Sequence, residues 1–208
     1  MLHLYVGSKR YSSWSLRPYL VLAQSGLEFE TTTILLDRDT TRGEIDKVNP
    51  AGRVPVLHHD GAVIWDSLAI CEYVNELAPG AKLWPEDRVQ RARARAIVCE
   101  MHAGFAALRT HMPMNLGDTL AGQGHTADAL TDARRVQTIW RDQLAVSGGP
   151  LLFGAFTIAD AMFAPVTTRF TTYAVDLDAT CRAYVDAVAA LPAMQQWTRD
   201  AGLEPVSR

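Results

Sequence analysis

The fold is decided by the stretch Asn49-Pro50-Ala51-Gly52-Arg53-Val54-Pro55-Val56-Leu57. A proline at the start of an apolar strand donates no hydrogen bond to the sheet. If the Val54–Pro55 bond is cis, the chain turns sharply and leaves the Val54 N–H and C=O free to pair with an extended peptide. An ordinary loop proline is the alternative, because X-Pro bonds are cis in only about 5–6% of cases.

The segments on either side of this stretch alternate between strand and helix patterns. Apolar or Thr- and Ile-rich runs predict strands at 2–6, 29–36, 54–57 and 62–65. The last two flank Asp60-Gly61, which is typical of a hairpin. Helices are expected at 16–23 and 68–77, with a looser one within 37–48. Residues 1–78 therefore read as a β-α-β-α-β-β-α unit, an α/β domain.

The remainder of the chain has a different character. Residues 79–87 form a linker that contains two prolines. From residue 88 to 208 helical periodicity predominates, with a long helix expected at 91–108 and further helices near 126–146, 158–174, 178–190 and 193–201. The second domain is therefore expected to be an all-α helical bundle.

Composition excludes several classes of protein. The 208 residues carry a net charge of -3, with Lys and Arg scattered, which argues against nucleic-acid binding. No apolar run reaches the roughly 18 residues of a membrane span, and the N-terminus has no signal-peptide pattern. Three dispersed cysteines, Cys71, Cys99 and Cys181, form neither a disulfide framework nor a metal motif. We expect a cytoplasmic protein without a bound metal.

Trp65-Asp66-Ser67 joins a predicted strand to a predicted helix. Ser67 is a good N-cap, and the free N–H groups of such a helix end bind carboxylates. Asp66 beside it suits an ammonium group, so the pair would hold the zwitterionic end of an amino acid. Plain helix capping is the alternative.

The segment Ser12-Ser13-Trp14-Ser15-Leu16-Arg17-Pro18 precedes the first predicted helix. Pro18 is expected in the first helical turn, which makes Ser15 the N-cap and places Ser12 just ahead of the helix. A hydroxyl donor there, with the positive helix end behind it, would stabilise a thiolate. A serine-rich capping loop is the alternative.

In order and spacing these features resemble the cytosolic glutathione transferase family over nearly the whole chain. The resemblance implies a thioredoxin-like N-terminal domain and an all-helical C-terminal domain. Residues 12–17 look like the serine signature of the zeta branch, the maleylacetoacetate isomerase-like one, and a bacterial, serine-type member is implied. By that resemblance Ser12 activates glutathione, which is the co-substrate.

The resemblance also implies the remaining site residues. Glutathione-binding positions are Ser13, Arg53, Val54, Asp66 and Ser67, and Asn115 either caps a helix or reaches the tripeptide. The expected second-substrate pocket comprises Trp14, His102, Phe105, Arg109, Met112 and Met114, although bundle core is the alternative for the Met and Phe residues. Arg109 is the only permanent charge in that set, so an acidic co-substrate is compatible with it.

Three functions are compatible with this sequence. The first is conjugation of glutathione to a small electrophile, and the second is glutathione-dependent cis–trans isomerisation on the same scaffold. Trp14 occupies the position of a cysteine associated with isomerase chemistry in the zeta branch, which weakens the second. The third is a non-catalytic binding protein, against which the intact Ser12, Val54-Pro55 and Asp66-Ser67 set argues. The family implies a two-fold homodimer, and no nucleic-acid or membrane partner is expected.

Overall fold

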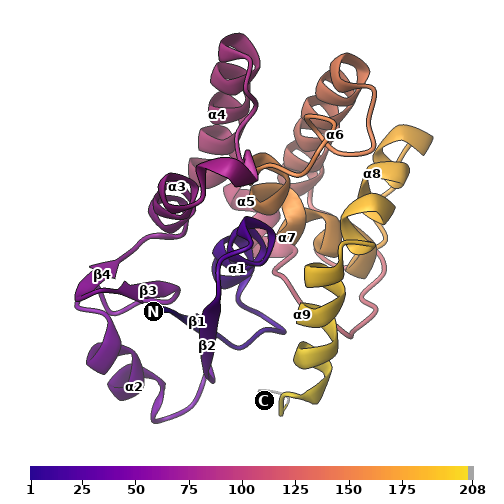
Figure 1. Ribbon diagram of the computed structural model, residues 1–208. Helices are drawn as coiled ribbons and strands as arrows, with labels where there is room; N and C mark the ends of the chain where they lie inside the picture. The colour runs from indigo at the N-terminus through magenta and orange to yellow at the C-terminus, as the bar shows by residue number, and fades with distance from the viewer. Residues whose placement is uncertain (206–208) are drawn as a thin grey trace.

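The computed structural model describes residues 1–205 and begins with a mixed four-stranded sheet (Figure 1). The strands are β1 (Leu2–Gly7), β2 (Phe29–Ile34), β3 (Val56–His59) and β4 (Ala62–Ile64), in the order β2-β1-β3-β4. β1 pairs parallel to β2 and antiparallel to β3, and β3 pairs antiparallel to β4 across the expected Asp60-Gly61 turn. The alternation of β1 buries Leu2, Leu4 and Val6 on one face.

Helices α1 (Ser13–Ser25) and α3 (Ser67–Leu77) pack against each other and against this buried side of the sheet. Helix α2 (Thr41–Val48) lies apart from them, beside β2, at the lower left of Figure 1. The βαβαββα order and the thioredoxin-like architecture predicted from the sequence are therefore confirmed. The short helix η1 (Pro79–Ala81) opens the connection to the second domain.

The second domain is entirely helical in the residues described. It comprises α4 (Arg88–Ala103), α5 (Ala106–His111), α6 (Ala127–Ser147), α7 (Ile158–Thr172), α8 (Ala179–Ala189) and α9 (Pro192–Leu203). Residues 206–208, the end of the expected helical domain, lie outside the described residues. A capping box opens α7, with the Asp160 carboxylate accepting from the Thr157 N–H.

Two sequence expectations about helix ends are wrong. The first helix begins at Ser13 with Ser12 as its N-cap, whereas Ser15 was the expected N-cap. Pro18 therefore lies beyond the first turn. The Ser12 side chain accepts from the Ser15 N–H, so the N-cap lies three residues before the expected one. The helix expected over 91–108 is broken, because Gly104 is extended and Phe105 is left-handed, with φ of 60°.

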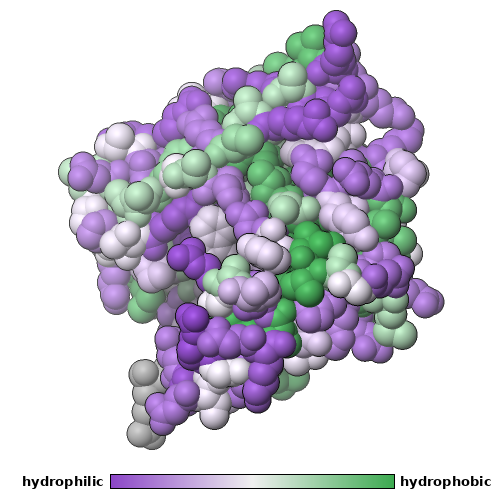
Figure 2. Space-filling view, turned by 90° about the vertical axis from the view of Figure 1, so that its left-hand side faces the viewer, coloured by the Kyte–Doolittle hydropathy of each residue, from purple (hydrophilic) through white to green (hydrophobic). Residues whose placement is uncertain are grey.

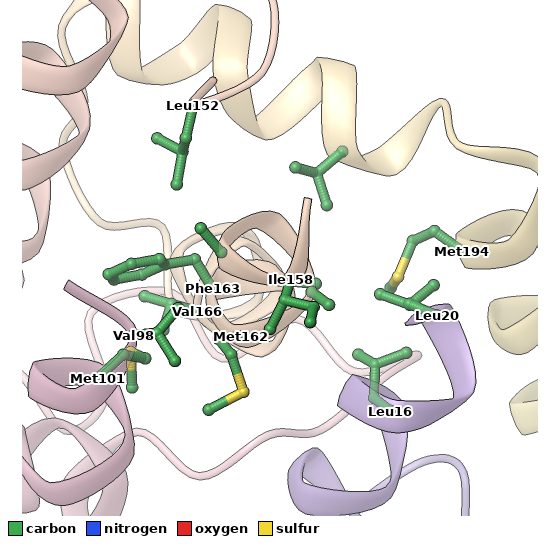
Figure 3. Packing of buried hydrophobic residues seen from close by; sticks show 14 of the residues in the cluster. Leu16, Leu20, Val98, Met101, Leu152, Ile158, Met162, Phe163, Val166 and Met194 are labelled. Atoms are coloured by element: carbon green, nitrogen blue, oxygen red, sulfur yellow. The ribbon is translucent and has the colours of Figure 1, made fainter. Parts of the chain in front are cut away.

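One hydrophobic core runs through both domains. Leu20 of α1 lies beside Met194 of α9 in Figure 3, and both side chains are buried in the same core as Leu16 of α1 and Met162 of α7. Helix α7 is buried along nearly its whole length and packs against α1. The N-terminus of α1 is therefore fixed from the helical side as well as from the sheet. No helix within residues 1–205 is long and apolar enough to cross a bilayer.

Candidate functional site

A pocket of about 240 Å³ lies where the start of α1, the start of α3 and α4 meet. Its lining combines four segments that are distant in the sequence: Trp14; Asn49, Ala51, Arg53, Val54 and Pro55; Trp65, Asp66 and Ser67; and His102. The first three segments are the ones the sequence analysis singled out. The pocket therefore brings together Trp14, Arg53, Val54, Asp66, Ser67 and His102 of the predicted site residues.

The segment before β3 is shaped by Asn49, which the sequence analysis did not single out. Its buried side chain donates to the Arg53 carbonyl at 2.6 Å and accepts from the Ala51 N–H at 3.0 Å. The Val54–Pro55 peptide bond is cis. Within the described residues neither the N–H nor the C=O of Val54 has a hydrogen-bond partner. The pocket wall thus presents an unpaired stretch of main chain, while the Arg53 side chain is exposed.

At the start of α3 the roles of Asp66 and Ser67 differ from expectation. Asp66 is the N-cap, and its Oδ1 accepts from the N–H groups of Leu68 and Ala69 at 3.1 and 3.4 Å. Ser67 is the first helical residue, and its hydroxyl is buried without a partner among residues 1–205, with the residue only 1% exposed. A carboxylate accepts two N–H bonds more strongly than a hydroxyl does, which explains why Asp66 takes the cap.

The second carboxylate oxygen of Asp66 faces the helical domain. Asp66 Oδ2 lies 3.0 Å from Nε2 of His102, which comes from α4. The His102 ring packs edge-on against the Trp14 indole, with ring centroids 5.3 Å apart. This chain of contacts closes the pocket between the two domains.

The loop that precedes α1, residues 8–12, carries the predicted activating hydroxyl. The Ser12 and Ser15 hydroxyl oxygens are hydrogen-bonded at 2.7 Å, and Ser15 Oγ also accepts from the Gly7 N–H at 3.0 Å. Ser15 is fully buried, whereas no partner within the described residues is found for the hydroxyl of Ser13. Neither Ser12 nor Ser13 lines the pocket. Trp14 is the residue of this loop–helix junction that does.

Trp14 is surrounded by cationic groups. The guanidinium groups of Arg17 and Arg109 lie 4.2 and 4.7 Å from the Trp14 ring centroid. Arg17 is 0% exposed, and none of its guanidinium nitrogens has a partner in the described part of the chain. Burial, followed by the charges of Arg109 and Arg169, holds the pKa of Arg17 well below its usual range. Burial also lowers the pKa of Arg109 and brings that of Arg169 to about 9.

Other predicted residues lie away from this pocket. Phe105, Met112 and Met114 are buried members of the hydrophobic core, the alternative that the sequence analysis kept for them. Asn115 donates to Asp118 at 2.9 Å, and its carbonyl accepts from the hydroxyl of Thr172. Arg109 donates to carbonyls at the end of α4, so its packing on Trp14 is fixed by the break after that helix.

The rim of the pocket is partly apolar. Figure 2 turns the side of α3, α4 and β4 toward the viewer and shows apolar side chains gathered across the middle of this face between hydrophilic ones. Two indoles line the pocket: Trp14 is 36% exposed and Trp65 47% exposed. Within residues 1–205 there is no cluster of three or more His, Cys, Asp or Glu side chains arranged to hold a metal ion.

Comparison with known proteins agrees with this geometry. The glutathione S-transferase N-terminal domain matches residues 11–77, and the glutathione S-transferase C-terminal domain matches residues 87–200. The chain therefore belongs to the glutathione S-transferase family. A glutathione transferase homolog from Burkholderia, solved with bound glutathione, is 26% identical over 98% of this chain and 99% of its own, with a TM-score of 0.75.

Curated relatives match a shorter part of the chain. A probable maleylacetoacetate isomerase of Caenorhabditis elegans is 38% identical over 97 residues, 47% of this chain and 45% of that protein. Protein LigF of Sphingobium is 41% identical over 86 residues, 39% of this chain and 33% of that protein. The chain thus spans less than half the length of these two relatives.

Proposed function

We propose that this protein binds glutathione in the pocket between α1, α3 and α4, holds its sulfur as a thiolate and transfers it to a small electrophile. One observation carries the proposal: the pocket wall concentrates polar groups that have no partner within the described residues. These are the Val54 N–H and C=O and the buried hydroxyl of Ser67. Buried polar groups normally have partners, so the wall is suited to a peptide-like ligand.

Each end of the tripeptide has a complementary group. Val54 pairs with the cysteinyl main chain. Ser67 and the N-terminus of α3 favour the γ-glutamyl carboxylate, and Asp66 favours the ammonium group beside it. Arg53, which is exposed at the rim, pairs with the other carboxylate. Ser13, which directly precedes the pocket-lining Trp14 and whose hydroxyl has no partner among residues 1–205, assists binding.

The hydroxyl pair at the start of α1 supplies the donor to the sulfur. Either hydroxyl can donate in the Ser12–Ser15 hydrogen bond. Because Ser15 is fully buried and already accepts from the Gly7 N–H, the Ser15 proton has an acceptor among the described residues when Ser15 donates to Ser12. That arrangement leaves the Ser12 proton for the sulfur of glutathione. Ser12 is then the catalytic residue and Ser15 its positioning residue.

The energies are sufficient without a general base. Lowering a thiol pKa by about two units from ~8.5 requires roughly 2.7 kcal/mol. A hydroxyl bond to a charged group contributes about 1.5–3 kcal/mol, and the N-terminus of α1 adds up to about 1 kcal/mol. The C–S bond forms as the leaving group departs with its electron pair, and the thiol proton has gone to solvent.

The electrophile is acidic in this proposal. Arg17 is a buried cation without an acceptor in the described residues, and it lies with Arg109 against Trp14. An uncompensated buried charge is costly, so a carboxylate that enters beside the partly exposed Trp14 gains a favourable partner. Isomerisation of a maleyl-type diketo acid is the second candidate, and the same cations together with the C. elegans isomerase relative favour it.

Two measurements test the proposal. Retention on immobilised glutathione, with elution by free glutathione, is expected, and failure to bind would contradict the proposal outright. Turnover is then compared between 1-chloro-2,4-dinitrobenzene and a maleyl-type diketo acid. Conjugation of the first supports the transferase, whereas isomerisation of the second without conjugation of the first replaces it with the isomerase.

A further inference from the structure

The loop of residues 8–12, which leads from β1 to the N-cap Ser12, is held by the helical domain. The Lys9 N–H donates to Glu204 Oε1 at 3.0 Å, and the Arg10 N–H donates to Glu204 Oε2 at 3.4 Å. The Lys9 carbonyl accepts from Trp197 Nε1 at 2.9 Å, and the Arg10 carbonyl accepts from the Leu116 N–H at 3.1 Å. All four main-chain polar groups of Lys9 and Arg10 are therefore bonded outside their own domain.

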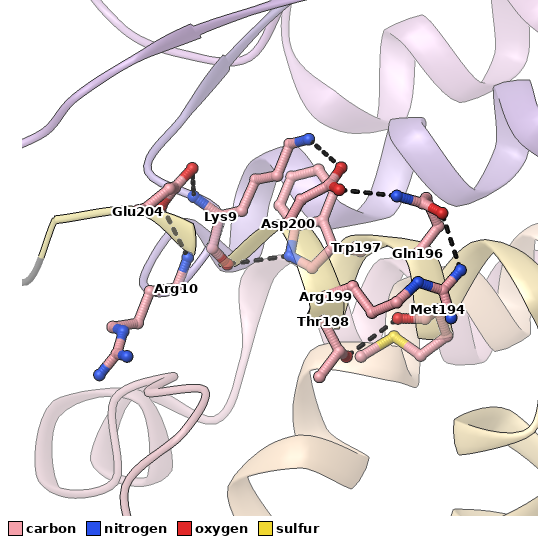
Figure 4. Close-up of polar contacts among 9 residues, drawn as sticks. All are labelled: Lys9, Arg10, Met194, Gln196, Trp197, Thr198, Arg199, Asp200 and Glu204. Carbon is pink, nitrogen blue, oxygen red and sulfur yellow. Dashed lines mark hydrogen bonds and ion pairs between the residues drawn. The ribbon is translucent and has the colours of Figure 1, made fainter. Parts of the chain in front are cut away.

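The side chain of Lys9 strengthens the same attachment, as Figure 4 shows. Its ammonium pairs with Asp200 of α9 at 2.5 Å and lies 5.6 and 5.9 Å from the ring centroids of Trp197 and Tyr19. Burial alone would raise the pKa of Asp200, but hydrogen bonds from Lys9 and Gln196 outweigh it and lower that pKa. The carboxylate therefore stays charged beside the ammonium at neutral pH.

The loop that is attached in this way ends at Ser12, whose hydroxyl the proposed function uses. The N–H groups of Tyr11 and Ser12 both donate to the Ser8 carbonyl, so the residues after Arg10 form one tight turn into α1. Because the main-chain polar groups of Lys9 and Arg10 are bonded only across the domain boundary, this part of the loop takes its position from the helical domain. A displacement of about 1 Å at a reacting group is enough to cost on the order of 100-fold in rate.

We propose that Trp197 of α9 and Glu204, the residue that follows α9, are positioning residues that hold the loop 8–12, and through it Ser12, in register with the glutathione sulfur. The inference rests on the proposed function for its thiol readout. Glu204 accepts two consecutive N–H groups with one carboxylate, and Trp197 holds the intervening carbonyl, so together they fix the peptide planes on both sides of Lys9. Helix α9 is thus part of the activating apparatus without contacting the substrate.

The direction in which the pKa of the bound thiol changes separates an effect of positioning from an effect of charge. Glu204→Gln removes a negative charge, which by Coulomb's law alone would lower the pKa of a nearby thiol. Loss of positioning weakens the bond from Ser12 to the sulfur and raises that pKa. Trp197→Phe changes no charge and keeps most of the packing, so it is expected to act in the same direction. Glu76→Gln on the exposed face of α3 is the matched control for charge.

The experiment combines amide hydrogen exchange with ultraviolet titration of the thiolate in the glutathione complex. In Glu204→Gln and Trp197→Phe we expect the Lys9 and Arg10 amides to exchange about tenfold faster or more. We expect the bound thiol pKa to rise by about half a unit to one unit, with glutathione affinity nearly unchanged and Glu76→Gln at the wild-type values.

Unchanged amide exchange, or a bound thiol pKa that stays at the wild-type value or falls in both variants, would overturn the inference. Failure of the proposed function gives a different result, because the wild-type complex itself would then show no lowered thiol pKa. Amide exchange in the free protein would still report whether Glu204 and Trp197 hold the loop.

Discussion

Asp66 performs two tasks that substitution can separate. Its Oδ1 caps α3, and in the proposed function its negative charge holds the glutathione ammonium. Asp66→Asn keeps a capping oxygen and removes the charge, since Asn and Asp are about equal as N-caps. Asp66→Ala removes both. The 3.0 Å contact between Asp66 Oδ2 and His102 Nε2 is more than half exposed on the Asp66 side and contributes little to stability.

The expected magnitude follows from these contacts. A charge-assisted bond to the ammonium contributes about 1.5–3 kcal/mol, so Asp66→Asn is expected to weaken glutathione binding by roughly 10- to 150-fold. The bound thiol pKa is expected to stay nearly constant, because Asp66 is at the γ-glutamyl end of the proposed site. Asp66→Ala is expected to lose the same affinity and a further ~0.5–2 kcal/mol of unfolding free energy.

Asp87 provides the matched control. It caps α4 through a bond from the Gln90 N–H at 2.8 Å and does not line the pocket. Asp87→Ala is therefore expected to lose a similar unfolding free energy without losing glutathione affinity. Titration calorimetry measures the affinities and thiolate absorbance the pKa. Wild-type affinity in Asp66→Asn would rule out the ammonium contact and leave Asp66 as a cap alone, and a large thiol pKa shift would mean that the two ends of the site are coupled.

Three further predictions concern buried polar groups. Ser15→Ala is expected to raise the bound thiol pKa and lower kcat while Ser12 remains in place; a larger effect of Ser13→Ala than of Ser12→Ala would instead move the activating role to Ser13. Arg17→Met is expected to raise the unfolding free energy by about 1 kcal/mol or more, because an unpaired buried cation is removed. The same variant is expected to raise KM for acidic electrophiles but not for a neutral one, and equal effects on both would contradict the anion role. Burial raises the pKa of Asp160 to about 6, above the ~3.9 of an unfolded Asp, so the native state holds more protons between these values. The unfolding free energy is therefore expected to fall as pH rises from about 4 to about 6, and urea denaturation of Asp160→Asn is expected to lose that slope.

Much of the fold could be predicted because the local signals agree with the tertiary contacts. The apolar and Thr-rich runs and the Asp60-Gly61 turn each place a strand or hairpin where the structure has it. The helix ends were harder to predict. Ser12, Ser13 and Ser15 are chemically equivalent as caps, and the choice among them depends on the Gly7 N–H that Ser15 accepts from across the loop.

A site residue could be predicted from the sequence where its role depends on one short segment of the chain. Val54, Asp66 and Ser67 fall in the pocket because each lies at a strand or helix end. Asn49 was missed although it precedes Pro50 at the start of a turn, a position where Asn commonly bonds its own loop. Arg17 was passed over within an apolar helix, where a lone cation is itself a signal. The bonds from Glu204 to the loop 8–12 span almost the whole chain and leave no local pattern.

Titration of the wild-type glutathione complex by thiolate absorbance shows whether this pocket holds glutathione as a thiolate. We expect a bound thiol pKa about two units below the ~8.5 of a free thiol. In Ser12→Ala we expect the bound thiol pKa to return most of the way to the free value while glutathione remains bound. A bound thiol that titrates near ~8.5 in the wild-type protein would show that the pocket does not activate glutathione.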